Sequence, residues 1–358
     1  MGVLEQGMRI VVVGATGNHG TSLCRRLSAD PNVDSVVGVA RRRPSLSLPK
    51  VTWVQADVTS DDLSPLFAGA DAVVSLVWLI QPGRRESVTR SVNVDGSARV
   101  FSAVAAAGVP TLVYASSVGA YAAGPKDRAV DESWSTAGIP TSFYSRHKAA
   151  VERILDSFEA SHPDVRVVRM RPGLCFKREA ATQIRRLFVG PFLPRSLVRR
   201  SLLPALPVTS RLRFQAVHTD DLAEAYRLAL MSDSARGAFN VAADPVLDGD
   251  TLSSVLSARQ LPLPSSILRA GAAASFHLRL QPSEPGWLDM GLGVPIMDTT
   301  RVRTELGWEP RVSAVDAFAE LFDGLREGGE LDTPPLARAT SGPARVREVL
   351  TGVGSTSR

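Results

Sequence analysis

The stretch Arg9-Ile10-Val11-Val12-Val13-Gly14-Ala15-Thr16-Gly17-Asn18-His19-Gly20 decides the fold. Its first half is a short apolar run, which is typical of a buried parallel strand, and helical spacing begins directly after the last glycine. Glycines at intervals of three between a strand and a helix let the backbone approach a pyrophosphate, whose charge then lies at the helix N-terminus. A plain glycine-rich turn is the alternative, but the loop opens a long strand–helix alternation that favours a dinucleotide site. The expected cofactor-binding residues in this loop are Gly14, Thr16, Gly17, Asn18 and Gly20, whereas His19 is expected to face solvent.

Apolar runs and helical patterns alternate along the first half of the chain. Strands are expected at 9–13, 36–39, 51–54, 71–77, 111–115, 166–170 and, further along, 239–241, and helices at 21–29, 63–67, 93–107 and 142–160. Alternation at these lengths specifies a parallel sheet with helices on both faces. The predicted fold class is therefore α/β, a doubly wound Rossmann sheet followed by a smaller C-terminal substrate-binding domain. The expected boundaries are 8–171 for the Rossmann domain, 172–326 for the substrate-binding region, interleaved with the Rossmann core around 214–242, and 327–358 for a mostly disordered tail.

Composition narrows the class of protein. The 358 residues are 44% hydrophobic and carry a net charge of +5, which is not packed into Lys/Arg runs with interleaved aromatics. Nucleic acid is therefore not an expected partner. The two cysteines provide no disulfide framework, the N-terminus lacks the pattern of a signal peptide, and no apolar stretch reaches the roughly 18 residues of a membrane span. We expect a cytoplasmic protein with no integral membrane segment and no metal site.

A tyrosine and a lysine are the candidate proton-transfer groups. Tyr144 and Lys148 lie four residues apart in the expected helix 142–160, so the phenol and the ammonium share one face. A free tyrosine, with a pKa of about 10, is a poor acid or base at neutral pH. A neighbouring ammonium and the positive charge of an oxidised nicotinamide ring would lower that pKa. A surface pair on an ordinary amphipathic helix is the alternative, but the position after the fifth expected strand favours catalysis.

Two serines, Ser116 and Ser117, follow the expected strand 111–115. Ligands of open parallel sheets bind beyond the carboxyl ends of the strands, where a hydroxyl can hydrogen-bond a substrate oxygen. We expect one serine to be catalytic and the other structural.

Taken in order, these motifs resemble the extended short-chain dehydrogenase/reductases, the NAD-dependent epimerase/dehydratase family. The resemblance covers about residues 8–326 and rests on Gly14-x-x-Gly17-x-x-Gly20, Asp57-Val58, Asn93-Val94-x-Gly96, Ser116-Ser117 with Tyr121, Tyr144-x-x-x-Lys148, Arg171-Pro172-Gly173, Val217-His218-Thr219-Asp220-Asp221-Leu222-Ala223, Phe239-Asn240-Val241 and Glu305-Leu306-Gly307-Trp308-Glu309-Pro310. It implies that Ser117 polarises the substrate, that Tyr144 is the acid/base and that Lys148 holds the nicotinamide ribose. Asp57 and Val58 would flank the adenine. Family members often dimerise through two Rossmann helices, so a homodimer is one assembly that the resemblance allows.

The end of the second expected strand departs from the family. An acid usually stands there and accepts from the ribose 2′-hydroxyl, but this chain has Ala40 followed by Arg41, Arg42 and Arg43. An arginine attracts a 2′-phosphate that an acid repels. Arg41 and Arg42 are therefore expected to bind the cofactor, with NADP favoured over NAD. Three solvated loop arginines are the alternative.

Three further departures concern the substrate. Family dehydratases resemble one another in an Asp-Glu pair after the catalytic hydroxyl, where this chain has Val118-Gly119, so dehydration is disfavoured. Leu174-Cys175-Phe176 stands where nucleotide-sugar members usually carry an asparagine, which weakens the case for such a substrate. Trp78, near the cofactor, is expected either to pack in the core or to form an apolar substrate wall.

The segment between Glu179 and Asp220 resembles the substrate lid of the family. It contains no acid and seven arginines, namely Arg185, Arg186, Arg195, Arg199, Arg200, Arg211 and Arg213. An anionic substrate or a membrane surface would suit this segment, and a solvated basic face with an apolar underside is an equal alternative.

The sequence thus predicts an NAD(P)-dependent oxidoreductase or epimerase that acts on a carbonyl/alcohol pair of a small molecule, anionic or apolar. Its catalytic residues would be Ser117, Tyr144 and Lys148. The rival hypothesis is a regulatory protein that binds NAD(P) without turnover, although a pure binder has no need of an acid/base pair.

Overall fold

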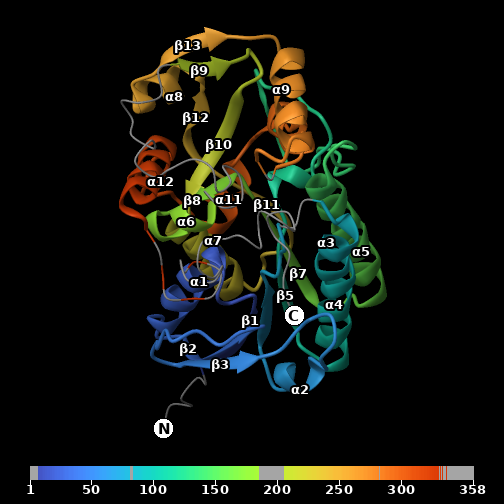
Figure 1. Cartoon of the computed structure of the whole chain (residues 1–358). Helices are drawn as coiled ribbons and strands as arrows, with labels where there is room; N and C mark the ends of the chain where they lie inside the picture. The colour runs from blue at the N-terminus through green and yellow to red at the C-terminus, as the bar shows by residue number, and fades with distance from the viewer. Residues whose placement is uncertain are drawn as a thin grey trace.

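The computed structural model describes residues 7–80, 84–184, 205–281 and 283–329, together with residues 331, 333 and 336. Its centre is a sheet of seven strands in the order β11-β7-β5-β4-β1-β2-β3 (Figure 1). Every pair of neighbouring strands in this sheet is parallel, which confirms the predicted doubly wound α/β class. The strands are β1 (Met8–Val13), β2 (Val33–Ala40), β3 (Val51–Gln55), β4 (Ala72–Ser75), β5 (Thr111–Ala115), β7 (Arg166–Pro172) and β11 (Gly237–Val241).

Helices cover both faces of the sheet. Successive side chains of a strand point to opposite faces, and in β1 Ile10 and Val12 join one core while Val11 and Val13 join the other. The first core is closed by α1 (Asn18–Ser28), α7 (Thr219–Met231) and α11 (Thr300–Leu306). The second core is closed by α2 (Ser64–Phe67), α4 (Gly96–Ala106) and α5 (Phe143–Ser161).

One expected helix is longer and less regular than its pattern suggests. In place of a single helix over 93–107, the chain forms α3 (Glu86–Arg90), a π-helical stretch at Ser91–Asp95 and then α4. Asn93 lies in the π-helical stretch, where its amide accepts from the backbone N–H of Leu79 (2.6 Å) and donates to the carbonyl of Leu79 (2.8 Å). The asparagine of the family motif therefore fixes the loop after β4, close to the candidate site.

The remaining elements form a second lobe, above the sheet in Figure 1. Strands β8 (Leu174–Phe176), β10 (Arg213–His218) and β12 (Ala243–Asp248) make a three-stranded sheet. Beside it lie the pair β9 (Ala205–Val208) and β13 (Arg259–Pro262), and α6 (Ala181–Ile184), α8 (Gly249–Leu256), α9 (Ser265–His277), α10 (Gly286–Gly293) and α12 (Ala314–Glu327). A last pair, β6 (Ala129–Val130) and β14 (Ile296–Met297), is parallel. Strand β11 returns to the large sheet between these elements, so the chain crosses between the lobes more than once.

Two expectations fall largely outside the described residues. The tail expected over 327–358 begins at the end of α12, and beyond residue 329 only residues 331, 333 and 336 are described. Five arginines of the basic segment, Arg185 to Arg200, also lie outside them. Among the helices that are described, none is long and apolar enough to cross a membrane.

Candidate functional site

The glycines of the loop between β1 and α1 differ in what surrounds them. Gly14 has φ +87°, and a Cβ there would lie 2.9 Å from backbone atoms of the loop after β4. A Cβ on Gly20 would lie 2.5 Å from the carbonyl oxygen of Gly14, so these two glycines are required by the packing. Within the part of the chain that the structure describes, a Cβ at Gly17 would meet only that same oxygen, at 3.5 Å, and no side chain caps the N-terminus of α1 that follows. The open space at Gly17 and the uncapped helix end fit a pyrophosphate group.

Asn18 and His19 lie at the start of α1 and face the second lobe and the lysines of the site. The amide Nδ2 of Asn18 donates to the carbonyl of Cys175 on β8 (3.3 Å), while its buried Oδ1 has no hydrogen-bond partner in the described part of the chain. The expectation that His19 faces solvent is wrong. His19 is half-buried, and its pKa is lowered to about 3 by burial and then by the charges of Lys148 and Lys177.

The other expected cofactor residues lie at the ends of β2 and β3. Val58 is buried, and the Asp57 carboxylate accepts from the backbone N–H and the hydroxyl of Thr59 (2.9 and 2.7 Å), which shapes the turn after β3. Arg41 and Arg42 are exposed directly after Ala40. Partial burial, and then the nearby charge of Arg41, lower the pKa of Arg42.

Ser117, Tyr144 and Lys148 come together at the carboxyl end of β5. The Nζ atom of Lys148 donates to the carbonyl of Ala115 (2.7 Å) and lies 5.9 Å from the centre of the Tyr144 ring. The Ser117 hydroxyl accepts from the backbone N–H of Gly119 (3.0 Å) and also hydrogen-bonds Tyr144. The three side chains that the sequence singled out therefore surround one site.

The pKa of Tyr144 differs from the expectation. Burial raises it to about 12, and the hydrogen bond from Ser117 only partly opposes that rise. Burial also lowers the pKa of Lys148 well below its ordinary value. The expected lowering of the Tyr144 pKa also invoked the charge of an oxidised nicotinamide, which would act in addition to that of Lys148.

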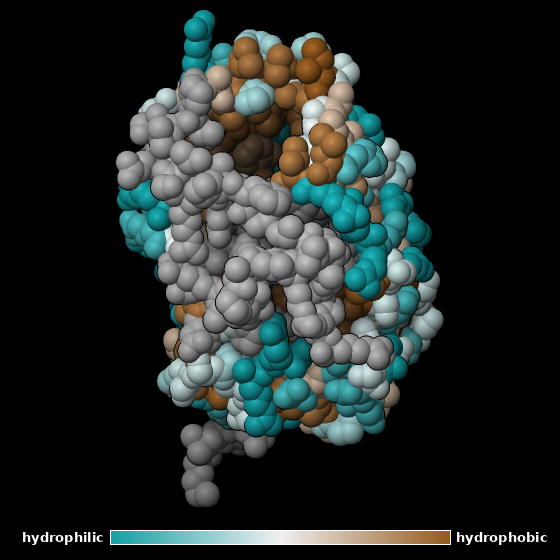
Figure 2. Space-filling model, viewed as in Figure 1, coloured by the Kyte–Doolittle hydropathy of each residue, from teal (hydrophilic) through white to brown (hydrophobic). Residues whose placement is uncertain are grey.

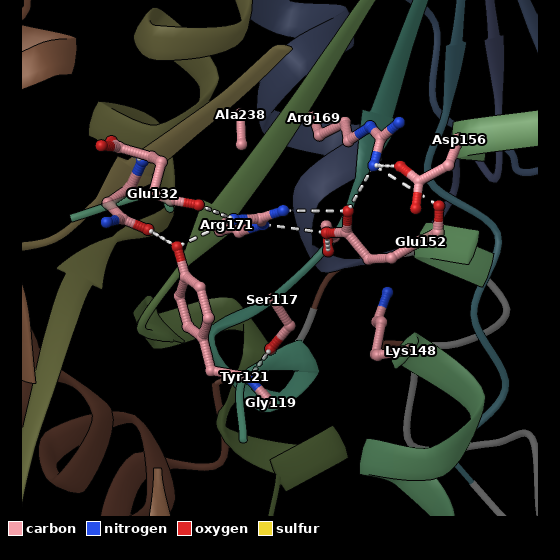
Figure 3. Close-up of polar contacts among 12 residues, drawn as sticks. Ser117, Gly119, Tyr121, Glu132, Lys148, Glu152, Asp156, Arg169, Arg171 and Ala238 are labelled. Carbon is pink, nitrogen blue, oxygen red and sulfur yellow. Dashed lines mark hydrogen bonds and ion pairs between the residues drawn. The ribbon is translucent and has the colours of Figure 1, made fainter. Parts of the chain in front are cut away.

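A buried ionic network supports this site, and the sequence analysis did not predict it (Figure 3). Glu152 lies one helical turn beyond Lys148 on α5 and is 0% exposed. Its carboxylate accepts from the Ser116 hydroxyl (2.5 Å), from the Arg171 guanidinium (2.9 and 3.0 Å) and from Arg169 (2.9 Å). Ser116 is thus tied into the network, whereas Ser117 is bonded to Gly119 beside Tyr144, and the catalytic role of Ser117 stays a prediction. Continuation of the spacing Tyr144, Lys148, Glu152 was the signal that could have revealed the carboxylate.

The same network accounts for the positions of Tyr121 and Asn240, two further residues of the family motifs. Arg171 also donates to the hydroxyl of Tyr121 (3.0 Å), and that hydroxyl donates to Oδ1 of Asn240 on β11 (2.7 Å). Tyr121 and Asn240 therefore join neighbouring elements of the large sheet rather than enter the site as reacting groups.

Aromatic rings enclose Tyr144. Trp78 packs edge-on at 5.5 Å between ring centres, and Trp287 from α10 lies at 4.8 Å. The Nζ atom of Lys148 lies 3.5 Å from the centre of the Trp78 ring. Trp78 is half-buried in the second core, as one interpretation expects, and also contacts both catalytic candidates, while its role as a substrate wall stays a prediction. Trp287 and Met290 belong to no motif, so no signal in the sequence indicated that they lie at the site.

The described part of the basic segment has a structural role. Arg211 donates to the carbonyls of Leu292 (2.9 Å) and Gly124 (3.2 Å), and so holds the end of α10. Together with the start of α9 and the end of α10, Arg211 lines a cavity of about 250 Å³. No group of three or more metal-ligating side chains occurs among the described residues.

Two proteins of Mycobacterium tuberculosis are among those similar to this chain in sequence. The uncharacterized protein Rv2047c of Mycobacterium tuberculosis is 26% identical over 323 residues, which cover 89% of this chain and 30% of that protein. The uncharacterized protein Rv0501 of the same organism is 25% identical over 331 residues, covering 88% of this chain and 83% of the relative. This chain thus spans less than a third of the first relative and most of the second.

Solved structures of several enzymes share the fold. MoeE5 in complex with UDP-glucuronic acid and NAD is 20% identical with a TM-score of 0.64, and the match covers 89% of this chain and 99% of MoeE5. The UDP-glucose 4-epimerase of Thermus thermophilus, in complex with NAD, is 19% identical with the same TM-score of 0.64 and the same coverage of 89% and 99%. At these identities the likeness concerns the fold.

The model of the NAD dependent epimerase/dehydratase family matches residues 10–242, which include the phosphate loop, Ser117, Tyr144 and Lys148. The match takes in well over half of the chain and agrees with the motifs and with the order of the strands. The chain belongs to the NAD dependent epimerase/dehydratase family.

Proposed function

We propose that this protein is an NAD(P)-dependent oxidoreductase or epimerase that interconverts an alcohol and a carbonyl in a small molecule. The observation that carries the proposal is the gathering of Ser117, Tyr144 and Lys148 at the carboxyl end of β5, on the same edge of the sheet as the loop at Gly17. Membership of the NAD dependent epimerase/dehydratase family supports it.

Each side chain has a chemical task in this proposal. The nicotinamide, when bound, supplies the hydride acceptor or donor. The Ser117 hydroxyl positions the substrate oxygen, and the Tyr144 hydroxyl exchanges a proton with it. Lys148 holds the nicotinamide ribose and places its positive charge near the phenol. Its Nζ atom now donates to the carbonyl of Ala115, and an ammonium has two further donors for ribose hydroxyls.

Dehydration lacks the groups that it needs. The two positions after Ser117 are Val118 and Gly119, and neither side chain can move a proton. The backbone N–H of Gly119 is bonded to Ser117, and a Cβ there would lie 2.8 Å from the Tyr144 ring. The glycine is thus needed for close packing of the tyrosine against the loop, and a larger acidic residue would displace it.

The cofactor that we propose is NADP, with NAD as the alternative. Arg41 and Arg42 are exposed at the end of β2, the edge at which a Rossmann fold meets the adenosine ribose. No acid stands at Ala40 to repel a phosphate.

A non-catalytic NAD(P)-binding protein is the rival. A pure binder would have no use for a phenol that is buried beside a lysine and hydrogen-bonded by a serine. Intact proton-transfer groups therefore favour the enzyme.

The decisive experiment removes the hydroxyl group of Tyr144. Tyr144→Phe should lower kcat by at least about a hundredfold, because general acid–base catalysis contributes that much, and should leave cofactor affinity within a few-fold. Tyr226→Phe is the control, since the buried hydroxyl of Tyr226 on α7 has no hydrogen-bond partner among the described residues. Release of reduced cofactor into solution distinguishes an oxidoreductase from an epimerase. Near-full activity of Tyr144→Phe would show that another group transfers the proton.

A further inference from the structure

The wall around the reacting oxygen is apolar. Trp78 and Trp287 lie against the Tyr144 ring, and Met290 from α10 approaches the same ring across Gly119. Tyr144 and Trp287 pack against a small core of Ile139, Met290 and Val294, which Val118 also joins. A substrate carbon held next to the Tyr144 hydroxyl would therefore meet rings, a thioether and methyl groups.

Polar partners for a sugar nucleotide are few among the described residues near this wall. A diphosphate and sugar hydroxyls need donors and acceptors to replace lost water, and each unmet buried group costs binding energy. Arg171 is bound to Glu152, and Arg211 is bound to the carbonyls of Leu292 and Gly124. Arg213 contributes in part to the lowered pKa of Asp248, after backbone hydrogen bonding, whereas its Nε atom is buried with no partner among the described residues.

Leu174 exposes an apolar side chain at the rim of the site. It begins β8, next to Cys175, whose carbonyl binds Asn18 of the phosphate loop and whose thiol lies close enough to Lys148 to be affected by its charge. Leu174 is 41% exposed, and it belongs to the stretch Leu174-Cys175-Phe176 that stands where nucleotide-sugar members usually carry an asparagine.

Apolar surface continues outward from α10. Arg269 of α9 pairs with Asp289 of α10 (2.8 Å), which joins the two helices. No side chain of α9 is fully buried, and Ile267 on this helix is 55% exposed. Figure 2 shows brown, hydrophobic atoms around a hollow of the upper lobe, beside the position of α9 in Figure 1. Exposed apolar surface is a feature of ligand-binding grooves as well as of protein and membrane contacts, and here it is joined through α10 to Trp287 and Met290.

We propose that the site takes a secondary alcohol or ketone with a bulky hydrocarbon skeleton, held by Trp78, Trp287, Met290 and Leu174, and not a sugar nucleotide. This inference rests on the proposed function. In the oxidation direction the C–H bond of the alcohol breaks and its hydride reduces NAD(P)⁺. The hydroxyl proton passes to Tyr144 and then to water, so that a ketone, NAD(P)H and a proton are formed.

The test uses the full chain with NADP⁺ and with NAD⁺, and four probes: isopropanol, cyclohexanol, menthol and UDP-glucose. We expect kcat/KM to rise by about tenfold at each step of the alcohol series, because each added apolar group is removed from water. Leu174→Asn, which keeps the branched shape and the number of side-chain heavy atoms and adds polarity, should raise the KM for menthol at least about fivefold and leave the value for isopropanol nearly unchanged. Leu261→Asn is the matched control, because Leu261 is a similarly exposed leucine (47%) on β13.

Binding is followed separately from turnover through the quenching of tryptophan fluorescence, since Trp78 and Trp287 lie at the site. If menthol quenches the fluorescence saturably and Leu174→Asn weakens this quenching, the substrate class is supported even when no alcohol is oxidised. In that case only the oxidoreductase proposal fails. The inference is overturned if UDP-glucose binds or reacts more efficiently than menthol. It is equally overturned if neither KM nor quenching depends on the size of the alcohol.

Discussion

Neighbouring residues in this site have different roles, and the role of each side chain follows from its hydrogen-bond partner. Ser116 and Ser117 are adjacent, yet one hydroxyl binds the buried Glu152 and the other binds Tyr144. The sequence could predict that one of them is structural, because alternate residues at a strand end face opposite ways. It could not say which carboxylate receives the structural hydroxyl, since Glu152 comes from a helix far along the chain.

The proposed preference for NADP over NAD also depends on single residues. If Arg41 and Arg42 bind the 2′-phosphate, a charge-assisted contact worth about 1.5–3 kcal/mol gives roughly a 10- to 100-fold preference for NADPH over NADH. Replacing both arginines with alanine should remove most of that preference, and Ala40→Asp should shift it toward NADH. Fluorescence titration of both cofactors measures this without the substrate.

The neighbouring Arg43 provides the control for that titration. Arg43→Ala removes the same charge one residue further along the exposed loop and should change the ratio of affinities by less than a few-fold. Equal affinities for NADPH and NADH in the unmodified protein would show that the arginines are solvated, and the enzyme would then be NAD-dependent or indifferent.

At the scale of elements, the network around Glu152 joins α5, which carries Tyr144 and Lys148, to β7. Burial alone would raise the pKa of Glu152, but hydrogen bonds from Arg171 and Ser116 and the charge of both arginines lower it to about 2. A carboxyl whose pKa is lower in the folded state than in the unfolded chain stabilises the fold above its unfolded pKa, near 4.5. That stabilisation is lost as the pH falls from about 4.5 toward 2.

Glu152→Gln should therefore lower the free energy of unfolding at pH 7 by about 3–5 kcal/mol, because two buried guanidinium groups lose their counter-charge. Between pH 4.5 and 2 the variant should lose less stability than the unmodified protein does. Urea unfolding at several pH values measures both effects.

The exposed partner of the same arginine serves as the control. Asp156 is 63% exposed and lies 2.7 Å from Arg169, so Asp156→Asn should cost less than about 1 kcal/mol. Equal effects of the two substitutions would mean that Glu152 is hydrated and not part of a buried network.

Elements with a clear local pattern could be predicted from the sequence, and those defined by distant partners could not. Most strands of the large sheet are short, largely apolar runs, and all seven lie close to their expected positions. The short strands β8 and β9 carry no alternation and exist because β10 and β13 pair with them. Trp287 and Met290 reach Tyr144 only when the chain returns from the second lobe, which no local spacing reveals.

In the whole molecule the two lobes are joined at several places. Lys177, directly after β8, is buried and donates to Thr21 Oγ1 (2.8 Å), Ser22 Oγ (3.0 Å) and the carbonyl of Asn18 (3.0 Å) on α1. Asp221 of α7 accepts through Oδ2 from the backbone N–H groups of Arg311 (3.0 Å) and Val312 (2.9 Å), which lead into α12 of the second lobe. We therefore expect the Rossmann and substrate-binding regions to unfold together, although their boundaries can be drawn along the sequence.

Trp308 tests this expectation, because it lies where the C-terminal segment meets the large sheet. The residue is 0% exposed, packs in the core that α1, α7 and α11 close, and donates from Nε1 to the carbonyl of Asp221 (2.8 Å). Trp308→Ala should cost about 3–5 kcal/mol, since it leaves a cavity and an unpaired carbonyl. Leu280→Ala, at a leucine that is 55% exposed, should change stability by less than about 0.5 kcal/mol. If the lobes are coupled, urea unfolding followed by far-UV circular dichroism and by loss of cofactor binding shows one transition that shifts as a whole in Trp308→Ala. Two transitions, of which only one moves, would instead show that the lobes fold independently.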